Sequence, residues 1–201
     1  MKLVVATRNE AKAQEMIQIL RQILDDNWEV VSFVGFPDFP EPEEIANTYR
    51  ENATIKAEAA AAYTNELCIA DDAGLEVDVL NGEPGVHSKR FGGEDLPFSQ
   101  KIALLLKRLE GNANRTARFK CAVAISKTGQ KTELFESSCE GKILESPRGS
   151  GGFGYDSIFS IPAINKTFAE MTQEEKNTIS HRGKVLSQFA EWTHSMKMPA
   201  S

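Results

Sequence analysis

The chain has 201 residues, of which 41% are hydrophobic and 26% are charged, a composition typical of a soluble globular protein with a sizeable core. Its net charge of −6 argues against a broad nucleic-acid-binding surface, and no apolar run is long enough to cross a bilayer. A signal peptide is not expected, since charges follow directly after Ala6, and three widely spaced cysteines indicate neither a disulfide framework nor a zinc site but a reducing cytoplasm.

The chain begins with a predicted buried strand, Lys2–Ala6, a polar turn, and an amphipathic helix that starts at Glu10. Backbone N–H groups at the start of a helix attract anions, and Thr7, Asn9 and Lys12 add side-chain donors. This junction fits two interpretations. It is either a phosphate-binding loop, or an asparagine cap followed by a solvated lysine.

A second strand is predicted over Glu29–Val34, and an irregular loop with three prolines follows over Gly35–Pro42. A helix is expected next, capped by Asn47 or Thr48 and ending near Asn65. The many alanines of this helix allow it to pack closely.

Polar side chains in and before this helix are candidates for a site. Asn52 and Lys56 are four residues apart, so they lie on one helix face. The Lys56 ammonium either extends into solvent or points at a phosphate. Glu44 is ordinarily a solvated loop residue, and it gains interest only as a third carboxylate near Asp71 and Asp72.

Two adjacent carboxylates, Asp71 and Asp72, form the most informative part of the sequence. The apolar run Cys68–Ala70 is interpreted as the end of a buried strand that opens into a turn at Gly74, where α/β proteins often carry their chemistry. Neighbouring residues on an extended backbone point to opposite sides, so the two carboxylates are expected to do different jobs. A metal or a basic group would neutralise them; alternatively, one caps the next turn and the other is solvated.

The middle of the chain is expected to be structural. We predict a half-exposed strand, a tight turn, a helix and a β-hairpin, over Leu75–Leu80, Asn81-Gly82, Leu96–Leu109 and Ala117–Cys139. The apolar hairpin is assigned to the core or to a subunit contact, and Arg115 and Arg118 are expected to be solvated.

A glycine-rich stretch, Arg148–Phe159, contains two aromatic residues and an aspartate. Its backbone permits close approach of a planar ligand, so Phe153 or Tyr155 can stack on a base while Asp156 or the backbone bonds the edge of that base. The alternative is a flexible loop whose aromatic side chains are anchored in the core. No Gly-Lys-Ser/Thr follows, so the stretch is not a P-loop.

The C-terminal region has a capping-box pattern at Thr172 and Glu175. Ser180 is expected to cap the final helix, which places His181 and Arg182 in its first turn. Cations there oppose the helix dipole, so an anion or an electron-rich ligand edge would compensate them. The alternative is an exposed pair.

The candidates sort into donors for a polyphosphate, oxygen ligands for Mg²⁺, and groups that stack on or bond a nucleobase. They are Thr7–Lys12, Lys56 and Lys176 for the phosphates; Glu44, Asp71 and Asp72 for the metal; and Phe153–Asp156, His181 and Arg182 for the base. The combination indicates a nucleoside polyphosphate and a metal-assisted attack on it.

Five motifs follow one another along nearly the whole chain. They are ATRNEAK at Ala6–Lys12, ENATIKA at Glu51–Ala57, ADDAGLEVDVLNGEPGVHSKRF at Ala70–Phe91, GGFGYDSIF at Gly151–Phe159 and EEKNTISHRGKVL at Glu174–Leu186. In this order they resemble the inosine triphosphate pyrophosphatase family, also called the noncanonical purine NTP or XTP/dITP diphosphatases. One such motif would be weak evidence, whereas five in register are specific.

The resemblance implies an α/β fold in which residues 1–201 form a single two-lobed domain. A long mixed central β-sheet is flanked by helices, and the active site lies in the cleft between the lobes. It also implies hydrolysis of ITP, dITP and XTP to the monophosphate and pyrophosphate, with Mg²⁺ as the cofactor, which cleanses the nucleotide pool. Members are usually cytoplasmic homodimers, and we expect neither a nucleic acid nor a membrane as partner.

The resemblance also implies roles for individual residues. The triphosphate would be held by Thr7, Arg8, Asn9, Glu10, Ala11, Lys12 and Lys56. Glu44 and Asp71 or Asp72 would bind Mg²⁺, and Asp72 would also accept the proton of the attacking water. The base and nucleotide pocket would be formed by Ala73, Phe153, Gly154, Tyr155, Asp156, Lys176, His181 and Arg182.

The chain departs from the family pattern at four positions. Arg8 and Ala11 stand in place of glycines, Ala73 in place of a serine, and Ser157 in place of a proline. Arg8 adds a charge that suits a triphosphate, whereas Ala73 removes a hydroxyl whose contact must pass to the backbone N–H or be lost. Because no carboxylate or lysine is removed, we expect activity.

Two other functions compete with this one. A related pyrophosphatase of the Maf-like family would act on pyrimidine or modified nucleotides, but the GFGYD and SHRG stretches argue against it. A nucleotide sensor without turnover would not need a water-activating carboxylate, so the presence of Asp71, Asp72, Lys12 and Lys56 argues against that function too.

Overall fold

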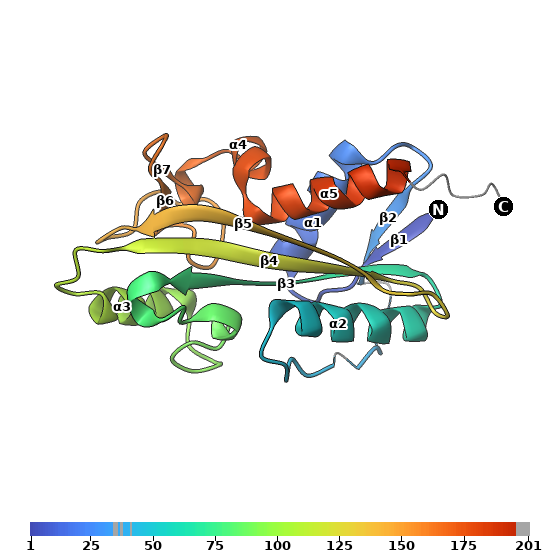
Figure 1. The fold of residues 1–201 in the computed structure, drawn as a ribbon, viewed down its shortest axis with the longest axis horizontal. Coiled ribbons are helices and arrows are strands. Elements are labelled where there is room, and N and C mark those ends of the chain that lie inside the picture. Colours follow the sequence, from blue (N-terminus) through green and yellow to red (C-terminus); the bar gives the residue numbers. More distant parts are fainter. Residues whose placement is uncertain (34–35, 37, 41, 196–201) are drawn as a thin grey trace. The chain divides into compact units, whose positions relative to one another are not determined.

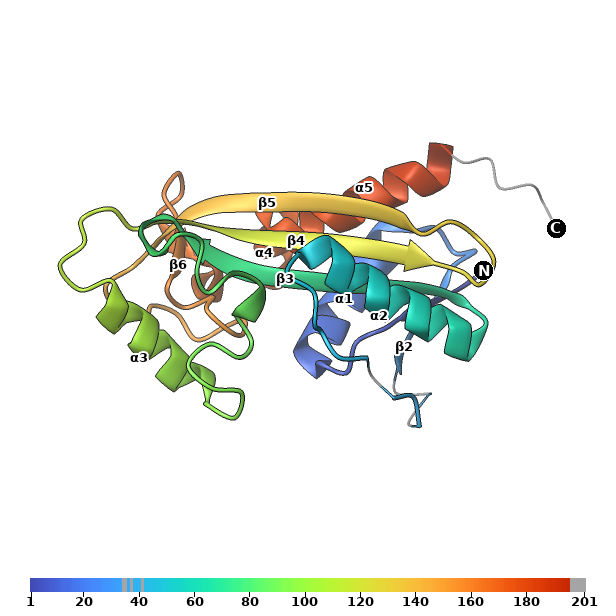
Figure 2. The same cartoon turned by 60° about the horizontal axis from the view of Figure 1, so that its bottom comes forward.

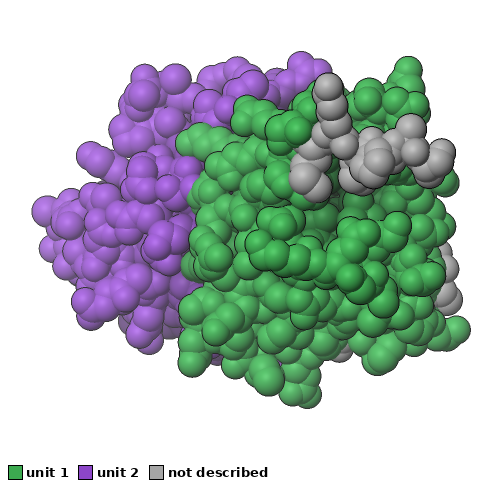
Figure 3. All heavy atoms as spheres, turned by 45° about the vertical axis from the view of Figure 1, so that its right-hand side comes forward, with its two compact units in different colours: residues 1–72, 121–137, 182–201 green, residues 73–120, 138–181 purple. Residues whose placement is uncertain are grey.

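In the computed structural model of the chain, the described residues are 1–33, 36, 38–40 and 42–195. They divide into two compact units, which Figure 3 shows in different colours. Unit 1 comprises Met1–Asp72, Cys121–Ser137 and the described part of Arg182–Ser201, and unit 2 comprises Ala73–Lys120 and Ser138–His181.

The described strands form one seven-stranded sheet in the order β2-β1-β3-β4-β5-β6-β7 (Figure 1). β1 pairs parallel with β2 and β3, whereas β6 pairs antiparallel with β5 and β7. The sheet is therefore mixed, which confirms the predicted α/β class. The strands are β1 (Lys2–Val5), β2 (Glu29–Ser32), β3 (Leu67–Val77), β4 (Thr116–Ser126), β5 (Glu133–Ile143), β6 (Phe159–Ile161) and β7 (Lys166–Thr167).

Helices cover the strands in both units. They are α1 (Glu10–Ile23), α2 (Tyr49–Thr64), α3 (Phe98–Arg108), α4 (Gln173–Ile179) and α5 (His181–Ser195). In unit 1, α1 and α5 lie on one face of the sheet and α2 lies on the other, as Figures 1 and 2 show together. Among the described residues, none of the helices is both long and apolar enough to span a bilayer.

The local sequence explains the elements of unit 1. The Asn9 side chain caps α1 by accepting a hydrogen bond from the Lys12 N–H. The Thr48 side chain caps α2 by accepting one from the Glu51 N–H. α2 ends at Asn65, which adopts the left-handed conformation with φ of 56°. The alanines of α2 bring the helix backbone close to the sheet, since all four that are buried are at most 1% exposed: Ala53, Ala57, Ala60 and Ala61.

The core of unit 2 is aromatic. The ring centroids of Phe119 and Phe159 are 4.7 Å apart, and those of Phe159 and Phe168 are 5.0 Å apart. Gly141 in β5 makes room for this packing, because a Cβ there would lie 2.4 Å from the Phe159 ring. Leu105 of α3 is fully buried in the same core.

One strand boundary was predicted wrongly. The sequence suggested that the third strand ends at Ala70 and turns at Gly74, but β3 continues to Val77. Leu75 and Val77 are completely buried, so burial of the strand outweighs the preference of glycine for a turn. A 3₁₀ turn, Asp78–Leu80, takes the place of the end of the predicted half-exposed strand.

Of the two arginines predicted to be solvated, Arg115 is not, whereas Arg118 is partly exposed and makes ion pairs at the surface. Arg115 is half-buried and donates to the carbonyl oxygens of Ile143, at 2.7 Å, and Leu144, at 2.8 Å. Arg118 pairs with the carboxylates of Asp78, at 2.8 Å, and Glu140, at 3.0 Å. Backbone acceptors of this kind come from residues distant in the sequence, so the local pattern did not reveal them.

Other predicted elements are confirmed. The turn at Asn81-Gly82 has positive φ at both residues, 54° and 88°, and the hairpin of β4 and β5 is present. Thr172 and Glu175 form the expected capping box of α4. Val34 of the second strand and Gly35, Pro37 and Glu41 of the following loop lie outside the described residues.

Candidate active site

Strand β3 carries the two adjacent carboxylates, which are almost completely buried. Asp71 is 1% exposed and Asp72 is 4% exposed. Because successive side chains of a strand point to opposite faces, the two carboxylates meet different elements. Asp71 contacts residues of α1 and α5, and Asp72 contacts residues of α2.

Asp71 lies between two cations. Its Oδ2 accepts hydrogen bonds from Arg182 Nη2 at 2.8 Å and Nε at 3.2 Å, and its Oδ1 is 3.4 Å from Lys12 Nζ. Burial raises the pKa of Asp71, but the charges of Lys12 and Arg182, with a smaller contribution from Lys56, outweigh it and hold the pKa well below its usual range. Asp71 is therefore ionised.

Arg182 also pairs with Glu15 of α1, which is 4% exposed. Glu15, Arg182 and Asp71 thus form a buried ionic chain that joins α1, α5 and β3. Sequence reasoning missed Glu15, since the only signal is its three-residue spacing from Lys12, which places both on one helix face.

Asp72 has a different environment. Its Oδ2 accepts a hydrogen bond from Asn52 Nδ2 at 3.0 Å, and its Oδ1 is 3.7 Å from Lys56 Nζ. Burial raises the pKa of Asp72, and Glu44 adds to this, so that Lys56 and Lys12 do not bring the pKa down to its ordinary value. Asp72 is therefore the more easily protonated of the adjacent pair.

Lys56 joins Asp72 to a third carboxylate. Its ammonium donates to Glu44 Oε1 at 2.6 Å. Burial lowers the pKa of Lys56, but Asp72, Asp71 and Glu44 outweigh it, so the net pKa is raised and the lysine is charged. The carboxylates of Glu44 and Asp72 therefore converge on one cationic group.

This convergence is the observation that bears on a metal. Mg²⁺ is usually bound through one or two carboxylates together with substrate phosphates, so Glu44 and Asp72 fit it. Asp71 fits less well, because its oxygens face Arg182 and Lys12. Within residues 1–33, 36, 38–40 and 42–195, no group of three or more His, Cys, Asp or Glu is placed to hold a metal by itself.

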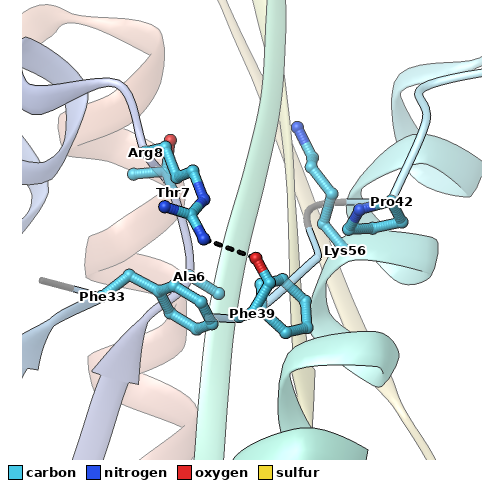
Figure 4. Close-up of a pocket in the computed structure, with 7 residues that line it drawn as sticks. All are labelled: Ala6, Thr7, Arg8, Phe33, Phe39, Pro42 and Lys56. Atoms are coloured by element: carbon cyan, nitrogen blue, oxygen red, sulfur yellow. Dashed lines mark hydrogen bonds between the residues drawn. The ribbon is translucent and has the colours of Figure 1, made fainter. Parts of the chain in front are cut away.

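The junction before α1 contains the predicted asparagine cap, and phosphate binding there stays a prediction. Asn9 is a helix cap, as described above, and the Asn9 N–H donates to Thr7 Oγ1 at 3.2 Å. A small pocket lies beside this junction, lined by Ala6, Thr7, Arg8, Phe33, Phe39, Pro42 and Lys56. Figure 4 shows the Arg8 guanidinium donating to the carbonyl of Phe39, and the Lys56 ammonium pointing away from this contact. Thr7, Arg8 and Lys56 are thus brought together, and Glu10 and Ala11 form the first turn of α1.

A second group of candidate residues lies in unit 2. Asp156 Oδ2 accepts hydrogen bonds from Lys176 Nζ at 2.8 Å and from the Phe153 N–H at 2.9 Å. The Lys176 ammonium is also 5.0 Å from the centroid of the Phe153 ring. Asp156 therefore fixes the backbone of the glycine-rich loop. Gly152 is needed there, since its φ is 69° and a Cβ would lie 2.2 Å from Asp156 Oδ2.

Two other side chains of this group are anchored in the core of unit 2. Tyr155 is 2% exposed and its hydroxyl donates to the carbonyl of Ser88 at 3.0 Å. His181 stacks on Phe119 with the ring centroids 4.8 Å apart. The alternative of core-anchored aromatics therefore applies to Tyr155, whereas Phe153 is only half-buried and better placed to stack on a ligand.

The structure thus brings the predicted residues together in two groups. The carboxylate–lysine cluster of unit 1 consists of Lys12, Glu44, Lys56, Asp71 and Asp72. The loop cluster of unit 2 consists of Phe153, Tyr155, Asp156, Lys176 and His181. Arg182 was expected with the loop cluster but pairs with Asp71 and Glu15 in unit 1, and its role in binding a nucleotide stays a prediction. Gly154, with φ of 64°, belongs to the loop, and Ala73 lies in β3.

Known proteins resemble the whole chain. A family model described as "Ham1 family" matches residues 3–192. A protein of Desulforamulus reducens named dITP/XTP pyrophosphatase is 49% identical over 193 residues, covering 95% of this chain and 94% of that protein. A protein of the same name from Geobacillus kaustophilus is 47% identical over 191 residues, covering 94% and 92%. The structure of the Staphylococcus aureus Ham1 protein superimposes with a TM-score of 0.86 at 36% identity, covering 98% of this chain and 100% of that one.

Proposed function

Because the chain belongs to the Ham1 family, we propose that it hydrolyses the noncanonical purine nucleoside triphosphates ITP, dITP and XTP to the monophosphate and pyrophosphate. The observation that carries this proposal is the convergence of Glu44 and Asp72 on Lys56 in a buried site. This convergence supports the proposal, because carboxylate oxygens suit a metal, an ammonium suits a phosphate, and a carboxylate suits a base for water.

In the reaction that we propose, the oxygen of a water molecule bonds to the phosphorus of the first (α) phosphate. The bond between that phosphorus and the oxygen that bridges to the second phosphate breaks, and pyrophosphate leaves. Asp72 accepts the proton of the water, a role that suits a carboxyl whose pKa is raised by burial. Lys12 and Lys56 bind phosphate oxygens and stabilise the charge of the departing pyrophosphate. Mg²⁺, held by Glu44 and Asp72, would neutralise phosphate charge when bound.

We propose that the loop cluster recognises the purine. Phe153 would stack on the base, and hydrogen-bond donors of Lys176 and His181 would meet the 6-oxo group of hypoxanthine or xanthine. The exocyclic amino group of adenine would present a donor to these donors. A mismatch between buried polar groups of this kind gives strong discrimination.

The expected role of such an enzyme is to remove deaminated purines from the nucleotide pool of the cytoplasm. We propose that Mg²⁺ is the cofactor and that the protein acts as a homodimer. A purine nucleoside triphosphate is its only proposed partner.

Pyrophosphate release from ITP, XTP, GTP and ATP, with and without Mg²⁺, tests this function. We expect ITP and XTP to be cleaved much faster than GTP and ATP, only with the metal, and the Asp72→Asn variant to keep about a thousandth of the wild-type kcat. Asp78→Asn is a matched control, because Asp78 directly follows β3 but pairs with the surface residue Arg118. Binding of ITP without release of pyrophosphate would contradict the proposal and favour a sensor.

A further inference from the structure

Asn52 of α2 is a buried amide that connects two parts of the carboxylate–lysine cluster. It is 1% exposed. Its Oδ1 accepts a hydrogen bond from the N–H of Ala46 at 3.0 Å, and its Nδ2 donates to the carbonyl of Ala46 at 3.3 Å and to Asp72 Oδ2 at 3.0 Å. One side chain thus binds both a loop and the carboxylate of β3.

The chemistry of these contacts requires an amide. A backbone N–H can only donate and an ionised carboxylate can only accept, so the side chain between them needs an acceptor and a donor at its two ends. This requirement also fixes which end of the Asn52 amide is oxygen. A carboxylate of the same shape at position 52 would keep the acceptor but oppose Asp72 with a second negative charge.

The loop that Asn52 binds is the one that carries Glu44, which lies two residues before Ala46. Lys56, one helical turn beyond Asn52, makes a second connection between the same partners, since it donates to Glu44 and faces Asp72 Oδ1. Asn52 and Lys56 differ in one respect. The Lys56 ammonium can exchange a carboxylate oxygen for a phosphate oxygen. Both N–H groups and the oxygen of the Asn52 amide, in contrast, already bond to the protein.

We propose that Asn52 is a positioning residue for the hydrolysis, an inference that rests on the proposed function. It fixes the distance between the Glu44 loop and Asp72, and it holds Asp72 by Oδ2 so that Oδ1 faces Lys56. Removal of the amide lowers the rate of the chemical step, because small displacements of reacting groups are costly, but it changes substrate binding little.

The test compares Asn52→Ala and Asn52→Asp with Thr48→Ala. The side-chain hydrogen bonds given for Thr48 are to Glu51 and cap the same helix, so its loss should lower the melting temperature without changing kcat. For both Asn52 variants we expect kcat to fall by about 100-fold while KM changes by less than about threefold. A kcat that stays within about threefold of wild type in both variants would overturn the proposal.

Two further measurements separate positioning from stability. Combining Asn52→Ala with Asp72→Asn should lower the residual rate no further than Asp72→Asn alone, since Asn52 acts through Asp72; an additional loss equal to that in the wild-type background would overturn the proposal. Amide hydrogen exchange of a peptide that contains Ala46 should be faster in Asn52→Ala but not in Thr48→Ala, and equal exchange in both would also overturn it.

The same experiment distinguishes this inference from the proposed function. If wild-type protein releases no pyrophosphate from any purine triphosphate, the proposed function fails, and the positioning role fails with it. If the wild type is active and Asn52→Ala is equally active, only the positioning role fails.

Discussion

The two faces of β3 at Asp71 and Asp72 provide opposite environments for the same side chain. Both carboxylates are buried, and burial alone raises the pKa of each. Asp71 has the guanidinium of Arg182 and the ammonium of Lys12 beside it, and its pKa falls well below its usual range. Asp72 accepts from a neutral amide and lies near Lys56, which it shares with Glu44, and burial together with the charge of Glu44 raises its pKa despite Lys56 and Lys12. The balance of nearby positive and negative charges, and not the depth of burial, separates the pKa values of the two carboxylates.

This difference assigns the carboxylates separate tasks. Asp71 takes part in a chain of ion pairs with Arg182 and Glu15 that ties two helices to the sheet. Asp72, whose pKa is raised, is the carboxyl that we propose as the general base. The assignment can be tested by removing one carboxylate at a time.

The largest expected effect is on the rate of hydrolysis when Asp72 is changed to Asn. We expect kcat for ITP to fall by about a thousandfold, the range of general-base catalysis, while the free energy of unfolding changes little. Steady-state pyrophosphate release and urea denaturation measure the two quantities. A variant with more than a tenth of the wild-type kcat would show that Asp72 is not the base.

Asp71→Asn should mainly affect stability. Breaking a buried ion pair removes one of the carboxylate partners of Arg182, and we expect a loss of about 3 kcal/mol in the free energy of unfolding. The control is Glu136→Gln, which breaks an exposed pair with Arg50 and should change stability much less. Equal losses in the two variants would show that the ionic chain does not stabilise the fold.

Glu15→Gln should cost less than Asp71→Asn, about 2 kcal/mol, because the Arg182 guanidinium keeps both of its hydrogen bonds to Asp71. In a double variant with Glu15→Gln and Asp71→Asn, the loss of unfolding free energy should differ from the sum of the two single losses, since both substitutions act on Arg182. A double-mutant cycle by urea denaturation measures this coupling. Strict additivity would mean that Glu15 and Asp71 act independently.

The smallest expected effect is the pH dependence of stability, and its sign differs for the two carboxylates. The folded pKa of Asp71 is lowered, so its stabilising contribution is present above the unfolded value of about 3.9 and is lost as the pH falls below it. The folded pKa of Asp72 is raised, so its contribution is present below that value and is lost as the pH rises through the folded pKa. As the pH rises from 3 to 7, the difference in unfolding free energy between wild type and Asp71→Asn should therefore grow. The contribution of Asp72 to the difference between wild type and Asp72→Asn should shrink. Parallel curves would contradict this.

Part of this arrangement could be predicted from the sequence. Hydrophobic periodicity located the strands and helices of unit 1, and the alternation of side chains on an extended backbone separated Asp71 from Asp72. The spacing of Asn52 and Lys56 correctly placed both on one face of α2. These are local properties, which a single sequence expresses directly.

The partners of the carboxylates could not be predicted in this way. Arg182 is 111 residues from Asp71, and Glu15 is 167 residues from Arg182. Only tertiary packing brings such residues together, and the local sequence around Glu15 carries no mark of its burial. The continuation of β3 past Gly74 is a similar case, because the burial of Leu75 and Val77 overrides the local turn preference.

The most direct test of the difference between Asp71 and Asp72 is a pH titration of their side-chain carboxyl carbons by NMR, assigned with the Asp71→Asn and Asp72→Asn variants. We predict that Asp72 titrates above the ordinary aspartate value of about 3.9, whereas Asp71 stays ionised to the lowest pH at which the protein remains folded. If both carboxyls titrated together, or if Asp71 became protonated first, the division of tasks between them would be refuted.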